Sequence, residues 1–132
     1  MGAIEGRCHC GRAGWRLASP PDRATTCNCT ACRRYGALWA YGELGTHTTF
    51  TGPTHAYVRD DIEQHLAFHF CPSCGAVVGW KPLDPEGNPR CAVNLRLAEP
   101  EAVAALPIIR FDGAGDWAVV PSNGRTVGDV WH

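Results

Sequence analysis

Three cysteines stand within the six residues Cys27-Asn28-Cys29-Thr30-Ala31-Cys32. Zinc is commonly bound by cysteine thiolates, and a zinc held by only three protein ligands keeps its fourth position open to water or substrate. Because three thiolates leave such a zinc electron-rich, it suits holding a substrate thiol as a reactive thiolate better than ionising water. An aldehyde carbonyl is the natural target of that thiolate. We therefore predict that this three-cysteine group, Cys27, Cys29 and Cys32, is a catalytic zinc site.

Four further cysteines occur in two closely spaced pairs, which together form what we call the four-cysteine group: Cys8, Cys10, Cys71 and Cys74. A structural zinc takes four ligands in a closed tetrahedron, usually as two pairs from two turns. The second pair is flanked by strand-like segments, which is the pattern of a zinc knuckle. Such a site would close a loop of roughly 60 residues, so its removal should unfold the protein.

Each cysteine group has an alternative interpretation. The four-cysteine group could form two disulfides. The three-cysteine group could be closed by Cys91 or His9 into a second structural site, or could act as a redox sensor that forms a reversible disulfide. The alternating pattern around Cys91 favours a small buried hydrophobic residue, and the place of His69 in a strand favours the surface.

Length and composition limit the possible classes of protein. A chain of 132 residues suits a single domain spanning residues 1–132, and 15 glycines and 10 prolines predict many turns and short strands. The net charge of −1 is spread evenly, which argues against a nucleic-acid partner. No segment is apolar enough to predict a membrane span, and the first residues do not resemble a secretory signal. We expect a cytoplasmic protein; the sequence does not indicate its oligomeric state.

The periodicity of apolar residues predicts a mainly β protein with one or two short helices. Strands are expected over residues 13–18, 37–44, 66–70, 76–80 and 91–97, with a strand, a turn and an edge strand within 46–65. A single helical turn is expected over 32–35, and the only true helix over 100–106, ended by Pro107. In the turn-rich tail from residue 111 to 131, Trp117 and Trp131 are predicted to anchor the packing.

Two pairs of side chains near the three-cysteine group could serve a site. Arg33 and Arg34 follow it directly and could offset its negative charge or bind a substrate carboxylate, although solvent-exposed arginines are an equally simple interpretation. Trp39 and Tyr41 could line a pocket beside the cysteines, although aromatic residues in strands usually belong to the core.

The cysteine pattern as a whole resembles a known family. Gly6-x-Cys8-x-Cys10-Gly11, Cys27-x-Cys29-x-x-Cys32-Arg33-Arg34 and Phe70-Cys71-x-x-Cys74-Gly75 occur in the order and spacing of the glutathione-dependent formaldehyde-activating enzymes, also called the centromere protein V domain family. Val93-Asn94-Leu95 and Phe111-Asp112-Gly113 also resemble family segments, so that the resemblance covers roughly residues 4–117. Asn28 departs from the pattern, because that position is often His.

The resemblance implies a mainly β, Mss4-like (β-tent) fold. It implies a structural zinc at Cys8, Cys10, Cys71 and Cys74 and a labile catalytic zinc at Cys27, Cys29 and Cys32, to which glutathione sulfur binds. The implied activity is that of a carbon-sulfur lyase that joins formaldehyde and glutathione into S-hydroxymethylglutathione, with a small thiol and an aldehyde as partners. Residues 46–65 show no glutathione-binding signature.

Two hypotheses follow. The first is a zinc-dependent enzyme that joins or splits a thiol and an aldehyde. The second is a non-catalytic zinc-binding module that presents a β surface to a partner protein, as the resemblance to Mss4-like and centromeric proteins also allows. Proteins with the same fold can have different pockets and therefore different substrates, so the fold alone does not distinguish the two hypotheses.

Overall fold

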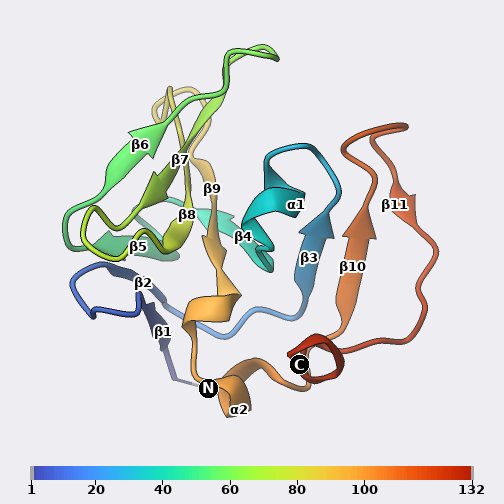
Figure 1. Ribbon diagram of the computed structural model, residues 1–132. Helices are drawn as coiled ribbons and strands as arrows, with labels where there is room; N and C mark the ends of the chain where they lie inside the picture. Colours follow the sequence, from blue (N-terminus) through green and yellow to red (C-terminus); the bar gives the residue numbers. More distant parts are fainter. Residues whose placement is uncertain (1, 132) are drawn as a thin grey trace.

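The computed structural model describes residues 2–131 and consists of two β-sheets joined by turns and short helices (Figure 1). The smaller sheet has the strand order β1-β2-β5, with β1 at Ile4–Arg7, β2 at Gly14–Leu17 and β5 at Thr48–Thr51. The larger sheet has the order β11-β10-β3-β4-β9-β8-β7-β6. Its strands are, in chain order, β3 (Ala24–Cys27), β4 (Trp39–Glu43), β6 (His55–Tyr57), β7 (Leu66–Phe70), β8 (Val77–Pro82), β9 (Arg90–Asn94), β10 (Ile108–Phe111) and β11 (Val119–Val120). The prediction of a mainly β fold is confirmed.

One strand pair in the larger sheet brings distant parts of the sequence together. β3 and β10 are parallel, with Ala24 opposite Ile108 and Cys27 opposite Phe111, whereas the other neighbouring strands are antiparallel. Because parallel strands end at the same edge of a sheet, the segment after Phe111 must lie beside the cysteines that follow Cys27. Figure 1 shows both connections at one end of the molecule, together with the connection between β6 and β7.

The helices are short. Helix α1 spans Cys32–Tyr35, as predicted, and ends at Gly36, whose left-handed φ of 63° lets its N–H reach the carbonyl of Cys32. The helix predicted over 100–106 is shorter: α2 spans Pro100–Val103 and ends three residues before the position at which Pro107 would stop it. No helix within residues 2–131 is long and apolar enough to cross a membrane.

The strand predicted over 91–97 ends at Asn94, where a 3-10 helix (η1, Leu95–Leu97) begins. The buried Asn94 amide explains the early end. Its Nδ2 donates to the carbonyl of Val77 at 2.9 Å, and its Oδ1 accepts from the backbone N–H groups of Leu38 and Arg96 at 3.3 and 3.2 Å. Side-chain bonds of this kind compete with the ladder of a sheet, a competition that apolar periodicity does not reveal.

The core lies between the two sheets and continues behind the three-cysteine group. Trp15, Leu17 and Leu38 are fully buried at its centre, and the Trp15 indole donates to the carbonyl of Asn94 at 3.0 Å. Trp131, next to the second 3-10 helix (η2, Val127–Val130), packs against this core as predicted. Trp117 does not: 68% of its surface is exposed, so its predicted role as an anchor is wrong.

Candidate metal centres

The four cysteines of the first group, 8, 10, 71 and 74, meet where the turn after β1 approaches the turn between β7 and β8. Their four sulfur atoms all lie within 4.8 Å of one another. The Sγ atoms of Cys8 and Cys10 are 3.6 Å apart, and those of Cys10 and Cys71 are 3.5 Å apart. In a tetrahedron with zinc-sulfur bonds of about 2.3 Å, neighbouring sulfurs are about 3.8 Å apart. The group therefore fits one zinc ion, and the eight cysteines of the chain are free thiols rather than disulfides.

Backbone geometry holds these sulfurs in place. Gly11 and Gly75, each one residue after a cysteine, have φ values of 83° and 79°, which favour glycine. The N–H of Gly75 donates to the carbonyl of Cys71 at 2.9 Å, and the N–H of Ala13 donates to the sulfur of Cys8 at 3.3 Å. Amide donors aimed at sulfur favour the thiolate, which is the form that binds a metal.

The three-cysteine group lies at the edge of the larger sheet where β3 and β10 end. β3 ends at Cys27, and α1 begins at Cys32. Its three sulfurs also lie within 4.8 Å of one another and could hold a metal ion. Hydrogen bonds from the thiols of Cys27 and Cys32 lower the pKa of Cys29, whereas hydrogen bonds with Cys27 and Cys29, together with burial, raise the pKa of Cys32. A backbone donor, the N–H of Cys32 at 3.3 Å, adds to the stabilisation of the Cys29 thiolate.

No fourth ligand joins the three-cysteine group among the described residues. Cys91 is fully buried in β9, where its sulfur contacts the carbonyl of Gly42 at 3.6 Å, in keeping with the small buried residue predicted there. His9 is exposed and belongs to neither cysteine group. His69 forms a hydrogen bond of 2.8 Å with the hydroxyl of Thr54. The two residues that could have closed the group therefore lie outside it.

The loop after β10, residues 112–117, lies directly against the three-cysteine group. Asn28 connects the two: its Nδ2 donates to Asp112 Oδ1, and its Oδ1 accepts from the N–H of Ala114, both at 2.9 Å. The side chain that departs from the family pattern thus fixes this loop. Gly113 sits so close that a Cβ there would lie 2.5 Å from the sulfur of Cys27, so only a residue without a side chain fits.

This contact yields a prediction for Gly113→Ala. The backbone at Gly113 is not in the left-handed region, so the change acts through the clash with Cys27 rather than through backbone strain. Changes in the groups that support metal ligands typically lower metal affinity by about 10- to 100-fold. We expect Gly113→Ala to lower the zinc affinity of the three-cysteine group by about the same factor, because the new Cβ displaces the sulfur of Cys27. Zinc retained per chain after mild chelation measures this. Ala114→Ser in the same loop is the control, and equal retention in both variants would contradict the prediction.

A cavity of about 350 Å³ opens beside the three-cysteine group. The three cysteines line it together with several large side chains: Trp39, Tyr41, Ile62, Trp80, Phe111 and Trp117. Of the two interpretations of Trp39 and Tyr41, both apply: the two residues line this cavity, and Trp39 is also a core residue with only 1% of its surface exposed. We call this space the aromatic cavity.

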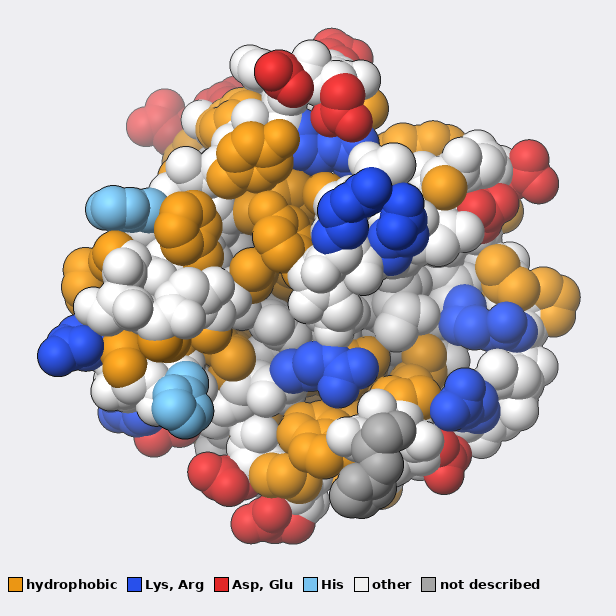
Figure 2. All heavy atoms as spheres, viewed as in Figure 1, with side chains coloured by type: hydrophobic (Ala, Val, Ile, Leu, Met, Phe, Trp, Pro, Cys, Tyr) orange, Lys and Arg blue, Asp and Glu red, His pale blue; other side chains and the backbone are white. Residues whose placement is uncertain are grey.

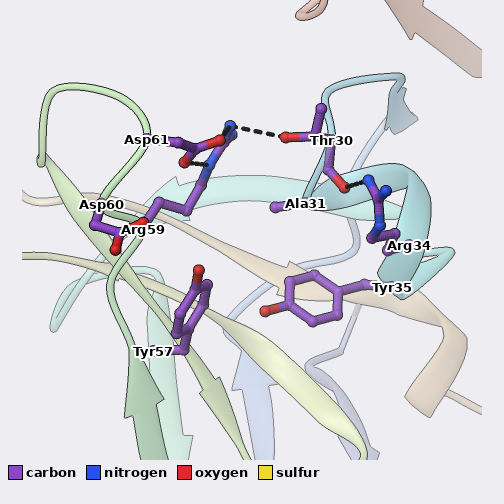
Figure 3. A pocket seen from close by; sticks show the side chains of 8 residues that line it. All are labelled: Thr30, Ala31, Arg34, Tyr35, Tyr57, Arg59, Asp60 and Asp61. Carbon is purple, nitrogen blue, oxygen red and sulfur yellow. Dashed lines mark hydrogen bonds and ion pairs between the residues drawn. The ribbon is translucent and has the colours of Figure 1, made fainter.

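A second cavity of about 450 Å³ adjoins it on the side of α1 and is lined mainly by polar and charged residues, Asp60 and Asp61 among them (Figure 3). Tyr35 and Tyr57 face it from α1 and β6, and Arg34 and Arg59 lie above them. Arg59 also lines the aromatic cavity, so the two spaces share a wall. We call this second space the polar cavity.

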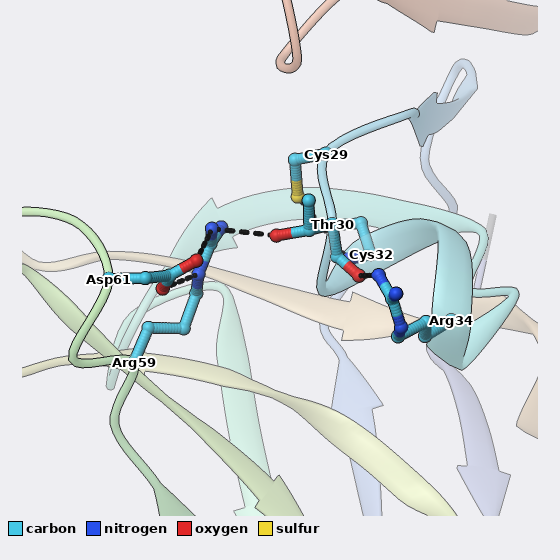
Figure 4. A network of polar contacts seen from close by, with 6 residues as sticks. All are labelled: Cys29, Thr30, Cys32, Arg34, Arg59 and Asp61. Carbon is cyan, nitrogen blue, oxygen red and sulfur yellow. Dashed lines mark hydrogen bonds and ion pairs between the residues drawn. The ribbon is translucent and has the colours of Figure 1, made fainter.

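Arg59, which the sequence analysis did not single out, is the arginine held most firmly near the three-cysteine group. Its guanidinium donates to both oxygens of Asp61, at 2.9 and 2.8 Å, and to the hydroxyl of Thr30 at 2.9 Å (Figure 4). The Asp61 carboxylate raises the pKa of Arg59, with a smaller contribution from the nearby Cys29 and Cys32. A permanently charged group therefore stands beside the cysteines.

Arg33 and Arg34, which follow the three-cysteine group in the sequence, occupy different positions in the structure. Arg34 lines the polar cavity and donates to the carbonyl of Thr30 at 2.8 Å. Arg33 is exposed and borders another hollow of about 410 Å³ on the far side of Cys27 and Cys32. Only Arg34 thus shares a cavity with Arg59.

The two sheets and the two cysteine groups define a mainly β protein of the Mss4-like fold in which both groups could hold zinc. The sequence model of the glutathione-dependent formaldehyde-activating enzymes matches residues 3–105. The chain belongs to this family, as its cysteine spacing predicts.

A comparison with solved structures supports the fold. The crystal structure of a Rhodobacter sphaeroides protein, determined by a structural genomics project, has 24% sequence identity to this chain and a TM-score of 0.60. The match covers 80% of this chain and 99% of that one. At this identity the likeness extends to the fold alone. Comparison with curated proteins finds no match.

Proposed function

We propose that this protein is a zinc-dependent enzyme of the carbon-sulfur lyase type that joins or splits a thiol, such as glutathione, and an aldehyde, such as formaldehyde. One observation carries the proposal: the three-cysteine group has no fourth ligand among residues 2–131 and faces a cavity of about 350 Å³. The proposed ligands of the catalytic zinc are Cys27, Cys29 and Cys32, and those of a structural zinc are Cys8, Cys10, Cys71 and Cys74.

Zinc bound to the three cysteines would hold the sulfur of the incoming thiol as a thiolate. In the joining direction, that sulfur forms a bond to the aldehyde carbon, the carbonyl π bond breaks, and the proton lost by the thiol ends on the new hydroxyl. Atoms and electrons balance without an oxidant or reductant. The reverse reaction breaks the carbon-sulfur bond and restores both substrates.

The surrounding residues position the reactants in this scheme. Asn28 and Gly113 let the loop after β10 close over the sulfurs, which limits the approach of water from that side. Arg59, held by Asp61 and Thr30, offsets part of the negative charge that three thiolates and a substrate thiolate would accumulate, since the Asp61 carboxylate balances some of its own charge. Reduced cysteines are essential to both proposed zinc sites, which favours the reducing environment of the cytoplasm.

Cobalt substitution tests this proposal, because a cobalt-thiolate site reports its ligands in its visible spectrum. We expect glutathione to change the spectrum of the cobalt-loaded protein, and the tripeptide with serine in place of cysteine to leave it unchanged. The four-cysteine group already has its full ligand set and should not respond. A spectrum unaffected by saturating glutathione would overturn the proposal in favour of a non-catalytic zinc-binding module.

A further inference from the structure

The aromatic cavity is larger and more apolar than formaldehyde requires. Two pairs of rings form its walls: Tyr41 and Trp80 with centroids 6.0 Å apart, and Phe111 and Trp117 with centroids 5.8 Å apart in an edge-to-face arrangement. The same four residues also line a further hollow of about 560 Å³, so the apolar surface continues beyond the cysteines. In Figure 2, hydrophobic side chains gather on the molecular face next to groups of Lys and Arg.

Formaldehyde has no substituent to place in such a space. A glutathione-like thiol carries an ammonium group and carboxylates, and the carboxylates lose hydration unfavourably against aromatic rings. The polar cavity suits these groups better. Arg34 and Arg59 supply guanidinium donors there for the carboxylates, and Asp60 and Asp61 supply carboxylates for the ammonium group. The aromatic cavity is then left for the group attached to the aldehyde carbon.

Trp117 gives a second, independent indication that this surface binds a ligand. It is the one non-glycine residue among residues 2–131 with a positive φ, 56°, and 68% of its surface is exposed. A bulky residue in this region of φ stores strain, and strain of this kind concentrates at binding and active sites. The loop that holds it is well defined: the N–H of Trp117 donates to the carbonyl of Asp112 at 2.9 Å, and Asp112 is bound by Asn28. Neither burial nor backbone preference explains a tryptophan here.

Building on the proposed function, we propose that the aldehyde substrate of this protein carries an aromatic group, which lies between the Tyr41–Trp80 and Phe111–Trp117 ring pairs while the carbonyl carbon meets the thiol at the three-cysteine group. The thiol's carboxylates lie in the polar cavity beside Arg34 and Arg59. Trp117 acts as a residue that determines specificity for the aldehyde rather than as a packing residue.

Stable thioethers test this inference without turnover. S-benzylglutathione and S-methylglutathione stand in for the adducts of glutathione with an aromatic aldehyde and with formaldehyde, and calorimetry on the zinc-loaded protein measures their binding. Burying a phenyl ring against the four aromatic residues should make the benzyl compound bind on the order of 10- to 100-fold more tightly. Equal affinities would overturn the inference.

The variant Trp117→Gly separates binding from structure. Glycine accepts the positive φ, so we expect the thermal midpoint to stay within about 3 °C of wild type or to rise. The advantage of the benzyl compound should fall by most of its 10- to 100-fold, with binding of the methyl compound unchanged. Leu83→Ala, which removes an apolar side chain that is 47% exposed and lines neither cavity, should preserve the advantage. A benzyl advantage that survives in Trp117→Gly would contradict the role of this residue.

Failure of this inference can be told from failure of the proposed function. If glutathione changes the cobalt spectrum while the two thioethers bind equally, the proposed function is supported and the inference of an aromatic substrate is wrong. If glutathione leaves the spectrum unchanged and neither thioether binds, both are wrong.

Discussion

Cys71→Ser is expected to unfold the protein under conditions in which wild type is fully folded. Cys71 is completely buried, and its sulfur lies 3.5 Å from that of Cys10, which belongs to a turn 61 positions earlier in the chain. Zinc binding contributes about 10–16 kcal/mol to the folding of small structural zinc sites, whereas whole domains are stable by about 5–15 kcal/mol. When loss of one ligand of the four-cysteine group releases the zinc, the free energy lost can therefore exceed the whole free energy of unfolding. Circular dichroism and thermal denaturation of the purified variant measure the effect.

Two controls test whether unfolding of Cys71→Ser results from loss of the metal. Ser73→Ala changes an exposed side chain in the same turn and leaves the backbone N–H groups that face the sulfur of Cys71, so it should fold with wild-type stability. Removing zinc from wild type with a strong chelator should unfold it, and adding zinc back should restore the fold. A metal-free wild type with an unchanged cooperative transition would show that the four-cysteine group does not depend on zinc.

The strands on either side of the turn at residues 71–74 are the parts of the fold that the sequence predicts well. Residues 66–70 and 76–80 match β7 and β8 closely, because two short apolar runs flank a turn that is marked by cysteines and Gly75. β3 and β10 were not predicted. They pair in parallel across more than 80 residues of chain, and a pairing of that kind leaves no local signal.

The same long-range pairing explains what the sequence analysis missed at the candidate site. Spacing alone brings Cys27, Cys29 and Cys32 together, and Trp39 and Tyr41 follow closely enough to be suspected. Phe111 and Trp117 reach the cysteines only because β10 lies beside β3, and Arg59 arrives on the connection between β6 and β7. The one clue in the sequence was the turn-rich setting of Trp117, because turns lie at the surface more often than in the core.

The second large effect is expected for Cys29→Ser, which should abolish turnover while the protein stays folded. The group it belongs to is partly exposed and lies at the end of β3, outside the cluster of residues that surrounds Trp15 and Leu17. Because changes in groups that merely support a metal ligand cost about 10- to 100-fold, loss of a ligand itself should lower kcat/KM by at least about 100-fold. Elemental analysis should find two zinc ions per chain in wild type and one in the variant, with the thermal transition retained.

Cys91→Ser supplies the matched control, because it makes the same chemical change at a cysteine outside both groups. Its hydroxyl replaces a sulfur that already faces the carbonyl of Gly42, so a modest loss of stability is the only expected effect, and both zinc ions and turnover should remain. A folded Cys29→Ser variant with full activity would show that the three-cysteine group is not the catalytic site. The contrast between Cys29→Ser and Cys71→Ser follows from the positions of the two metal sites. The four-cysteine group would connect turns far apart in the sequence through its zinc, whereas the three-cysteine group occupies a single turn that the sheet can hold without a metal.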